Sequence, residues 1–167
     1  MDVILIRHAE AGDRNPAIWS DDDLRAVTPG GERKMSAVTR AMKAMGIRFD
    51  HLVTSPLTRA LQTAAILRDV CGLKEPAQIN EALGHGCTPP GVVQLLSKYP
   101  PDATIALVGH EPALSAVAAA MIGPSGDARI ALKKGGCLGI GFDGTARLGT
   151  GTLLFHLKPG QLKKLGH

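Results

Sequence analysis

The chain has 167 residues, a length typical of one domain, and its 19 basic and 15 acidic residues give a net charge of +4. Hydrophobic residues make up 44% and aromatic residues only 3%, which predicts an aliphatic core and provides no stacking platform for nucleic acid. No segment reaches the ~18 apolar residues of a membrane helix, and no leader pattern precedes the first charges, so we expect a cytoplasmic protein that does not enter the membrane.

The first predicted strand ends in charged side chains. Residues 3–6 are apolar and mostly β-branched, as in a strand buried on both faces, and Arg7, His8 and Glu10 follow them. Ligands of open α/β sheets bind beyond the carboxyl ends of the strands. Arg7 and His8 are therefore candidates for an active site, although a solvated strand end would give the same pattern.

A loop and an amphipathic helix come next. Residues 11–27 are rich in glycine, asparagine, proline and aspartate, which predicts a surface loop. Thr28 and Pro29 then have the pattern of an N-cap and a first-turn proline. Methionine and valine at helical spacing predict a core-facing helix as far as Gly46. Arg25 lies just before this helix.

The second predicted strand leads into a helix that carries another arginine. Residues 51–54 are expected to form the strand, and Ser55 with Pro56 is interpreted as the start of a helix that ends near Val70. Arg59 falls in the first turn of this helix, where free N–H groups favour an anion and a guanidinium adds a bidentate phosphate donor. A structural salt bridge is the alternative role of Arg59.

The middle of the chain carries a candidate acid. A short strand is expected at residues 78–79, a glycine-rich loop at 80–86 and a short helix at 91–98. The loop contains Glu81 and His85, either of which could donate a proton. An exposed loop carboxylate is an equally good interpretation of Glu81.

A second histidine follows a buried strand later in the chain. Residues 104–108 are apolar and predict a strand, and His110 comes just after it. A lone histidine at this place would usually be a structural one, but here the arrangement of Arg7 and His8 recurs. An alanine-rich helix is expected to follow over residues 112–122.

The order of these elements predicts the fold class. Alternation of strands and helices predicts an α/β protein, a three-layer α/β/α sandwich with a mostly parallel central sheet of about six strands. Residues 137–142 and 153–157, with a turn signal between them, are expected to add a hairpin-like pair that stops at Pro159 and Gly160. Without a linker or repeat, residues 1–167 are expected to form a single domain.

Together, the candidate residues favour phosphoryl chemistry. Arg7, His8, Arg59 and His110 should meet in one crevice, because each follows a strand. Guanidinium forks match phosphoryl oxygens and neutralise the charge that spreads over them during transfer. His8 is the candidate nucleophile, because nearby cations should keep its ring neutral while its other nitrogen donates to a backbone carbonyl. His110 would stabilise the equatorial oxygens in the transition state.

The remaining chemistry concerns the proton donor and metals. Glu81, His85 and Glu10 are the candidates for protonating a leaving group, although Glu10 could simply pair with Arg7. No metal or other cofactor is expected, because the arginines supply positive charge and no carboxylate cluster is present. The three cysteines are widely spaced and lack a Cys-x-x-Cys pair, so ordinary reduced thiols are expected rather than a zinc site or a disulfide framework.

With these residues assembled, the sequence resembles the histidine phosphatase superfamily, the phosphoglycerate mutase-like proteins. Three motifs in the family's order carry the resemblance: Arg7-His8-Ala9-Glu10, the run SPLTRALQTA from Ser55 to Ala64, and Val108-Gly109-His110. The resemblance implies a phosphoglycerate mutase-like fold and a phosphohistidine intermediate on His8. It also implies a phosphate pocket formed by Arg7, Arg59 and His110.

Within the superfamily the sequence is similar to the SixA-type phosphohistidine phosphatases. It shares their Arg-His-Ala form of the first motif, the lack of a large helical insert, and a segment from Arg25 to Gly31 that departs from their pattern at Val27. This similarity implies that Arg25 belongs to the phosphate pocket. Arg14 stands where mutase-like relatives usually carry an asparagine, which leaves its role open, and the mutase acid maps best onto Glu81.

We therefore expect a phosphatase, with a phosphohistidine on a histidine-phosphotransfer-type protein as its substrate. Exchanging one P–N bond for another depends little on a leaving-group acid, and a small domain without a lid leaves its crevice open to a protein. One alternative is a metal-independent phosphatase of a small phosphomonoester. Others are a mutase, which the absent insert disfavours, and a non-catalytic phosphate-binding module on the same fold.

Overall fold

The chain folds around one mixed β-sheet. The computed structural model describes residues 1–123, 125 and 128–165. In this part of the chain, six strands are arranged in the order β3-β2-β4-β1-β5-β6. The strands are β1 (Asp2–Arg7), β2 (His51–Thr54), β3 (Gln78–Ile79), β4 (Thr104–Gly109), β5 (Cys137–Gly141) and β6 (Thr152–Leu157). The first four pair in parallel, whereas β5 is antiparallel to both β1 and β6.

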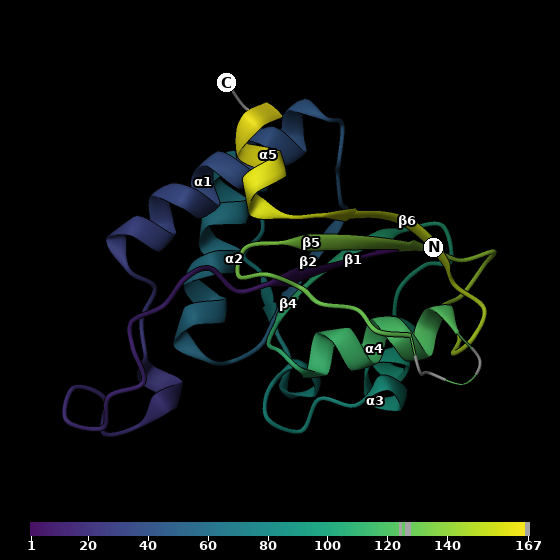
Figure 1. The fold of residues 1–167 in the computed structure, drawn as a ribbon. Helices are drawn as coiled ribbons and strands as arrows, with labels where there is room; N and C mark the ends of the chain where they lie inside the picture. Colours follow the sequence, from purple (N-terminus) through teal and green to yellow (C-terminus); the bar gives the residue numbers. More distant parts are fainter. Residues whose placement is uncertain (124, 126–127, 166–167) are drawn as a thin grey trace.

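Helices cover both faces of this sheet. Figure 1 shows α1, α2 and α5 on one face and α3 with α4 on the other, which confirms the predicted three-layer α/β/α architecture. The helices are α1 (Pro29–Ala44), α2 (Thr58–Cys71), α3 (Pro89–Leu96), α4 (Ala113–Ile122) and α5 (Pro159–Leu165), with short 3₁₀ turns η1 (Asp22–Leu24) and η2 (Glu81–Leu83). None of the helices in the described residues is long and apolar enough to cross a membrane.

The central strand β1 is buried on both faces, as its apolar run predicts. Val3 and Leu5 belong to the hydrophobic cluster under α3 and α4, whereas Ile4 and Ile6 belong to the cluster under α1 and α2. All four side chains are at most 3% exposed. Because alternate residues of a strand point to opposite faces, this pattern fixes the register of β1 and hence the position of the residues that follow it.

The element boundaries differ from the prediction in three places. Helix α2 begins at Thr58 and has no side-chain cap, because its N-cap residue is Leu57; the Ser55 hydroxyl contacts His110. Helix α3 begins earlier than expected, at Pro89, because Thr88 is its N-cap and accepts a hydrogen bond from the Gly91 N–H. Pro159 follows the end of β6, as predicted, and is also the first residue of α5. Proline is tolerated in a first helical turn.

Candidate active site

The parallel register of the sheet brings three strand ends together. In this register Arg7 is opposite Gly109, and Thr54 is opposite Val108. The His8 N–H donates to the Gly109 carbonyl at 3.1 Å, and the Ser55 N–H donates to the Val108 carbonyl at 3.0 Å. His8, Ser55 and His110 therefore lie side by side at the carboxyl edge of β1, β2 and β4, where an open α/β sheet binds its ligand.

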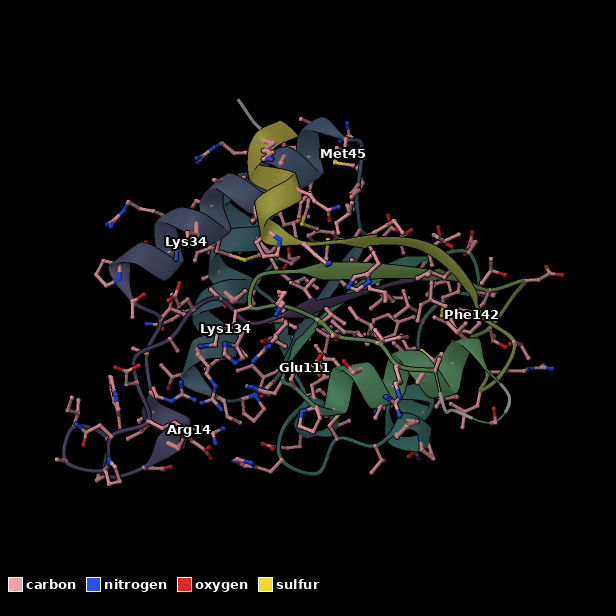
Figure 2. All side chains as sticks on the ribbon, viewed as in Figure 1. Arg14, Lys34, Met45, Glu111, Lys134 and Phe142 are labelled. Carbon is pink, nitrogen blue, oxygen red and sulfur yellow. The ribbon has the colours of Figure 1, made fainter. Side chains whose placement is uncertain are left out.

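A cavity of about 260 Å³ lies at this edge. In Figure 2, Arg14, Glu111 and Lys134 lie around this region on the same side of the molecule. The cavity is lined by Arg7, His8, Gly12, Asp13, Arg14, Arg25, Arg59, His110, Glu111 and Lys134. The structure thus brings together the two arginines and two histidines that the sequence pattern singled out, together with Arg25 and Arg14.

His8 is buried and has one free ring nitrogen. Its side chain is 6% exposed, and its Nδ1 lies 2.7 Å from the Ala9 carbonyl oxygen. A carbonyl can only accept, so Nδ1 carries the proton and Nε2 keeps its lone pair. Burial lowers the pKa of His8 to about 3, and His110, Arg59 and Arg7 add to this effect. The ring is therefore neutral at pH 7, but desolvation contributes more to this than the neighbouring cations.

The loop after His8 is held by helix α2. The Ala9 N–H donates to the Thr63 hydroxyl at 2.9 Å, and this hydroxyl donates to the Arg59 carbonyl at 2.6 Å. Thr63 is fully buried. This chain of bonds links the backbone next to the candidate nucleophile to the first turn of the helix that carries Arg59.

Arg7 is oriented by a glycine turn before β5. Its Nη1 donates to the Leu132 carbonyl at 2.8 Å. The Gly135 N–H lies 3.1 Å from the Arg7 carbonyl and 3.2 Å from that of His8, and Gly135 has a φ of +73°, a conformation that favours glycine. Burial lowers the pKa of Arg7, whereas Glu111 raises it; Arg7 remains charged.

Arg25 and Arg59 share one carboxylate. The Arg25 Nε donates to Oδ1 of Asp22 at 2.9 Å, and the Arg59 Nη2 lies 3.3 Å from Oδ2. Arg59 also donates through Nη1 to the Asp22 carbonyl at 2.9 Å, and Arg25 donates to the Gly12 carbonyl at 2.9 Å. The hydrogen bond from Arg25 is the main cause that lowers the pKa of Asp22. Most donors of Arg25 are thus used within the loop, while Arg59 keeps its Nε free.

His110 faces His8 across the cavity. The two ring centroids are 5.2 Å apart, and Nε2 of His110 lies 2.7 Å from the Ser55 hydroxyl. Burial lowers the pKa of His110 to about 4, with a further contribution from Arg59. This second histidine is therefore also neutral at pH 7 and can act as a hydrogen-bond donor or acceptor.

Three buried nitrogens in this cavity have no hydrogen-bond partner among the described residues. They are Nε of Arg7, Nε of Arg59 and Nδ1 of His110. Buried polar atoms are almost always hydrogen-bonded, so an unpartnered group asks for an explanation. All three belong to residues that line one cavity together with His8. Guanidinium and imidazole groups are usual hydrogen-bond donors to an anion with several oxygens.

None of the three candidate acids lines the cavity. Glu10 pairs with Lys34 at 2.6 Å rather than with Arg7, and His85 contacts Asp23 at 2.6 Å. Glu81 begins the 3₁₀ turn η2, is exposed and is not among the residues that line the cavity. The role of Glu81 as an acid stays a prediction.

Three charged residues of the lining were not singled out from the sequence. The carboxylates of the cavity are Asp13 and Glu111, and Lys134 adds a further cation. Glu111 accepts a hydrogen bond from the Ser115 hydroxyl at 2.7 Å, which leaves a second carboxylate oxygen for other contacts. The sequence signal for Glu111 was its position directly after His110, at the end of a predicted strand. Lys134 belongs to the turn before β5. This turn is distant from β1 in the sequence but is hydrogen-bonded to the end of β1 in the folded chain.

The donor set of the site is nitrogen-rich and cationic. Within the described part of the chain, no group of three or more histidine, cysteine, aspartate or glutamate side chains is placed to hold a metal ion. All three cysteines are free thiols. Positive charge at the cavity comes from the guanidinium groups and Lys134.

Comparison with known proteins identifies the family of this chain. Residues 3–84 match the model of the histidine phosphatase superfamily (branch 1). An uncharacterised protein of Picosynechococcus sp. is 33% identical over 150 residues, which cover 89% of this chain and 88% of that protein. The chain belongs to the histidine phosphatase superfamily. Members of this superfamily are phosphatases and mutases, so the chain belongs to this class of enzyme.

Other relatives extend the comparison. A probable phosphoglycerate mutase of Yersinia enterocolitica is 40% identical over 77 residues, which cover 44% of this chain and 34% of the mutase. The structure of the protein histidine phosphatase SixA complexed with tungstate has a TM-score of 0.79 and 21% identity, covering 98% of this chain and 100% of that one. Phosphoserine phosphatase from Entamoeba histolytica has a TM-score of 0.66 and 19% identity, covering 96% and 98%. These structures show the shared fold.

Proposed function

We propose that this chain is a phosphatase that removes the phosphoryl group from a phosphohistidine on a protein, through a phosphohistidine intermediate on His8. The observation that carries the proposal is the set of three buried nitrogens without a partner, on Arg7, Arg59 and His110, in residues that share one cavity with a neutral His8. The similarity in fold to SixA supports the choice of substrate.

In the first step, Nε2 of His8 attacks phosphorus. A bond forms between this nitrogen and phosphorus, and the P–N bond to the substrate imidazole breaks. The electron pair returns to the substrate ring, which leaves as neutral imidazole because its other nitrogen carries a proton. Arg7, Arg59 and His110 donate to the three equatorial oxygens, where negative charge spreads in the transition state. Because one P–N bond replaces another, this step is nearly balanced and depends little on a strong acid.

In the second step, water hydrolyses the intermediate. The water oxygen bonds to phosphorus, the bond to His8 breaks, and inorganic phosphate leaves. A proton from this water must be accepted by a nearby base. Glu111 is a carboxylate in the lining of the cavity and lies close enough to Arg7 to affect its pKa, so we propose it as the base.

The rim of the cavity is compatible with a protein substrate. A volume of about 260 Å³ is close to the lower end of the range for ligand pockets and accommodates a phosphoryl group together with the side chain that carries it. The protein that carries this side chain would lie against the rim, where the Arg14 side chain is 78% exposed.

A phosphatase of a small phosphomonoester is the second candidate. It is favoured by the similarity in fold to a phosphoserine phosphatase, and by the presence of Glu111 and Asp13 in the lining. A P–O ester needs a proton on its leaving alkoxide, so a carboxyl group would be essential for this reaction. Glu81 and Glu111 are the two residues that we propose for that role.

A turnover assay separates these possibilities. We would compare a phosphorylated histidine-phosphotransfer domain with a panel of small phosphomonoesters, using His8→Ala as the blank and the Glu81→Gln and Glu111→Gln variants in parallel. Fast dephosphorylation of the protein alone, with little loss in Glu81→Gln, is the expected result. Turnover confined to one ester would contradict the proposed substrate. If the wild type shows no turnover and the His8→Ala variant still binds phosphate, the chain is a phosphate-binding module.

A further inference from the structure

Ser55 is buried behind His110 at the end of β2. Its side chain is fully buried, and its Oγ lies 2.7 Å from Nε2 of His110. The same oxygen accepts a hydrogen bond from the Leu57 N–H at 3.3 Å. Ser55 does not line the cavity, so any effect on a bound phosphoryl group must pass through His110.

The direction of this hydrogen bond follows from the inventory of donors and acceptors. A serine hydroxyl has one proton, and a buried hydroxyl is expected to donate it. Among the described residues, Nε2 of His110 is the acceptor within reach, because the Leu57 N–H is itself a donor. Nε2 therefore accepts from Ser55, and the single proton of the neutral ring lies on Nδ1.

We infer that Ser55 is a positioning residue, which fixes the tautomer of His110 so that its Nδ1–H can donate to a phosphoryl oxygen. Nδ1 is the buried ring nitrogen that has no partner among the described residues. With the opposite tautomer, Nδ1 would direct a lone pair at a negatively charged oxygen. The two histidines then carry their protons on the same atom for different uses, because His8 attacks through Nε2 and His110 donates through Nδ1.

Nitrogen NMR of the protein without substrate tests the tautomer directly. In the wild type at neutral pH, His110 should be protonated on Nδ1, and in Ser55→Ala a substantial fraction should move to Nε2. Thr39→Val is a matched control, because it removes another fully buried hydroxyl, which donates to the Met35 carbonyl inside α1. Protonation of His110 on Nε2 in the wild type, or an unchanged tautomer in Ser55→Ala, would overturn the inference.

Kinetics test the consequence for the reaction, which rests on the proposed function. Ser55→Ala should lower kcat by about tenfold or more with little change in KM, because the lost donor acts on charge that develops in the transition state. Thr39→Val should keep wild-type kcat. Unchanged kcat in Ser55→Ala, with His110→Ala inactive, would overturn the role of Ser55. Absence of turnover in the wild type would reject the proposed function, while the NMR result would still decide the tautomer.

Discussion

The ionisation state of His8 is set by its burial. A run of four apolar residues places this side chain inside the carboxyl edge of the sheet, where it is 6% exposed and has a pKa lowered to about 3. The sequence pattern predicted a neutral ring and a backbone carbonyl as the partner of its second nitrogen, and the Ala9 carbonyl fills that position. The dominance of desolvation over neighbouring charge could not be predicted, because it depends on how closely the folded chain encloses the ring.

The lowered pKa of His8 predicts how stability depends on pH. In the unfolded chain this histidine titrates near its ordinary pKa of 6.5, so between about pH 3 and pH 6.5 the unfolded state binds more protons than the folded state. The contribution of His8 to the free energy of unfolding is therefore complete above about pH 6.5. It is lost as the pH falls, by about 1.4 kcal/mol per pH unit at most.

Urea denaturation across this pH range measures the effect. We expect the free energy of unfolding of His8→Asn to fall less steeply between about pH 6.5 and pH 4 than that of the wild type. Parallel pH profiles of the two proteins would contradict a buried neutral His8.

Helix α1 begins against the loop that follows the proposed nucleophile, His8. A Cβ at Gly31 would lie 2.1 Å from the Glu10 carbonyl oxygen, whereas a Cβ at Gly30 would have the Thr28 Oγ1 as its nearest neighbour, at 3.9 Å. Thr28 caps the helix by accepting from the Gly31 N–H at 2.9 Å and also donates to the Glu10 carbonyl at 3.3 Å. The first turn of α1 therefore helps to hold the segment that contains His8.

This close contact predicts opposite effects for two adjacent glycines. Gly31→Ala should destabilise the protein by about 1–3 kcal/mol, because the added methyl must push the Glu10 backbone away. Gly30→Ala should be neutral or stabilise by up to ~1 kcal/mol, because alanine favours a helix and space is available. Thermal and urea denaturation of the two variants would measure the difference. Equal stabilities would show that α1 does not pack against Glu10 as described.

Some helices and strands could be located from the sequence, and others could not. Long periodic segments such as α1 and the strand runs could be located from the sequence, because a buried face imposes a repeat on apolar residues. Ser55 and Pro56 also had the pattern of a helix start. In the fold, however, the Ser55 hydroxyl forms a tertiary hydrogen bond with His110. Helix α5 was missed, since Pro159 signals both the end of a strand and the first turn of a helix.

The parallel register of the sheet brings the residues of the candidate site together. It aligns the ends of β1, β2 and β4 and thereby gathers Arg7, His8 and His110 from segments about a hundred residues apart. The topological rule for α/β sheets was sufficient to predict this convergence. It could not place Lys134 in the lining, because the contribution of Lys134 depends on the path of the chain before β5.

We propose that His8 carries the phosphoryl group during turnover. The most direct measurement is mass spectrometry of the protein after rapid quenching with phosphoryl donor, under alkaline conditions that preserve a P–N bond. We expect one added phosphoryl group, located on His8 and absent from the His8→Ala variant. Turnover with a phosphoryl group on another residue, or an adduct that persists in His8→Ala, would contradict the role of His8 as the phosphoryl carrier.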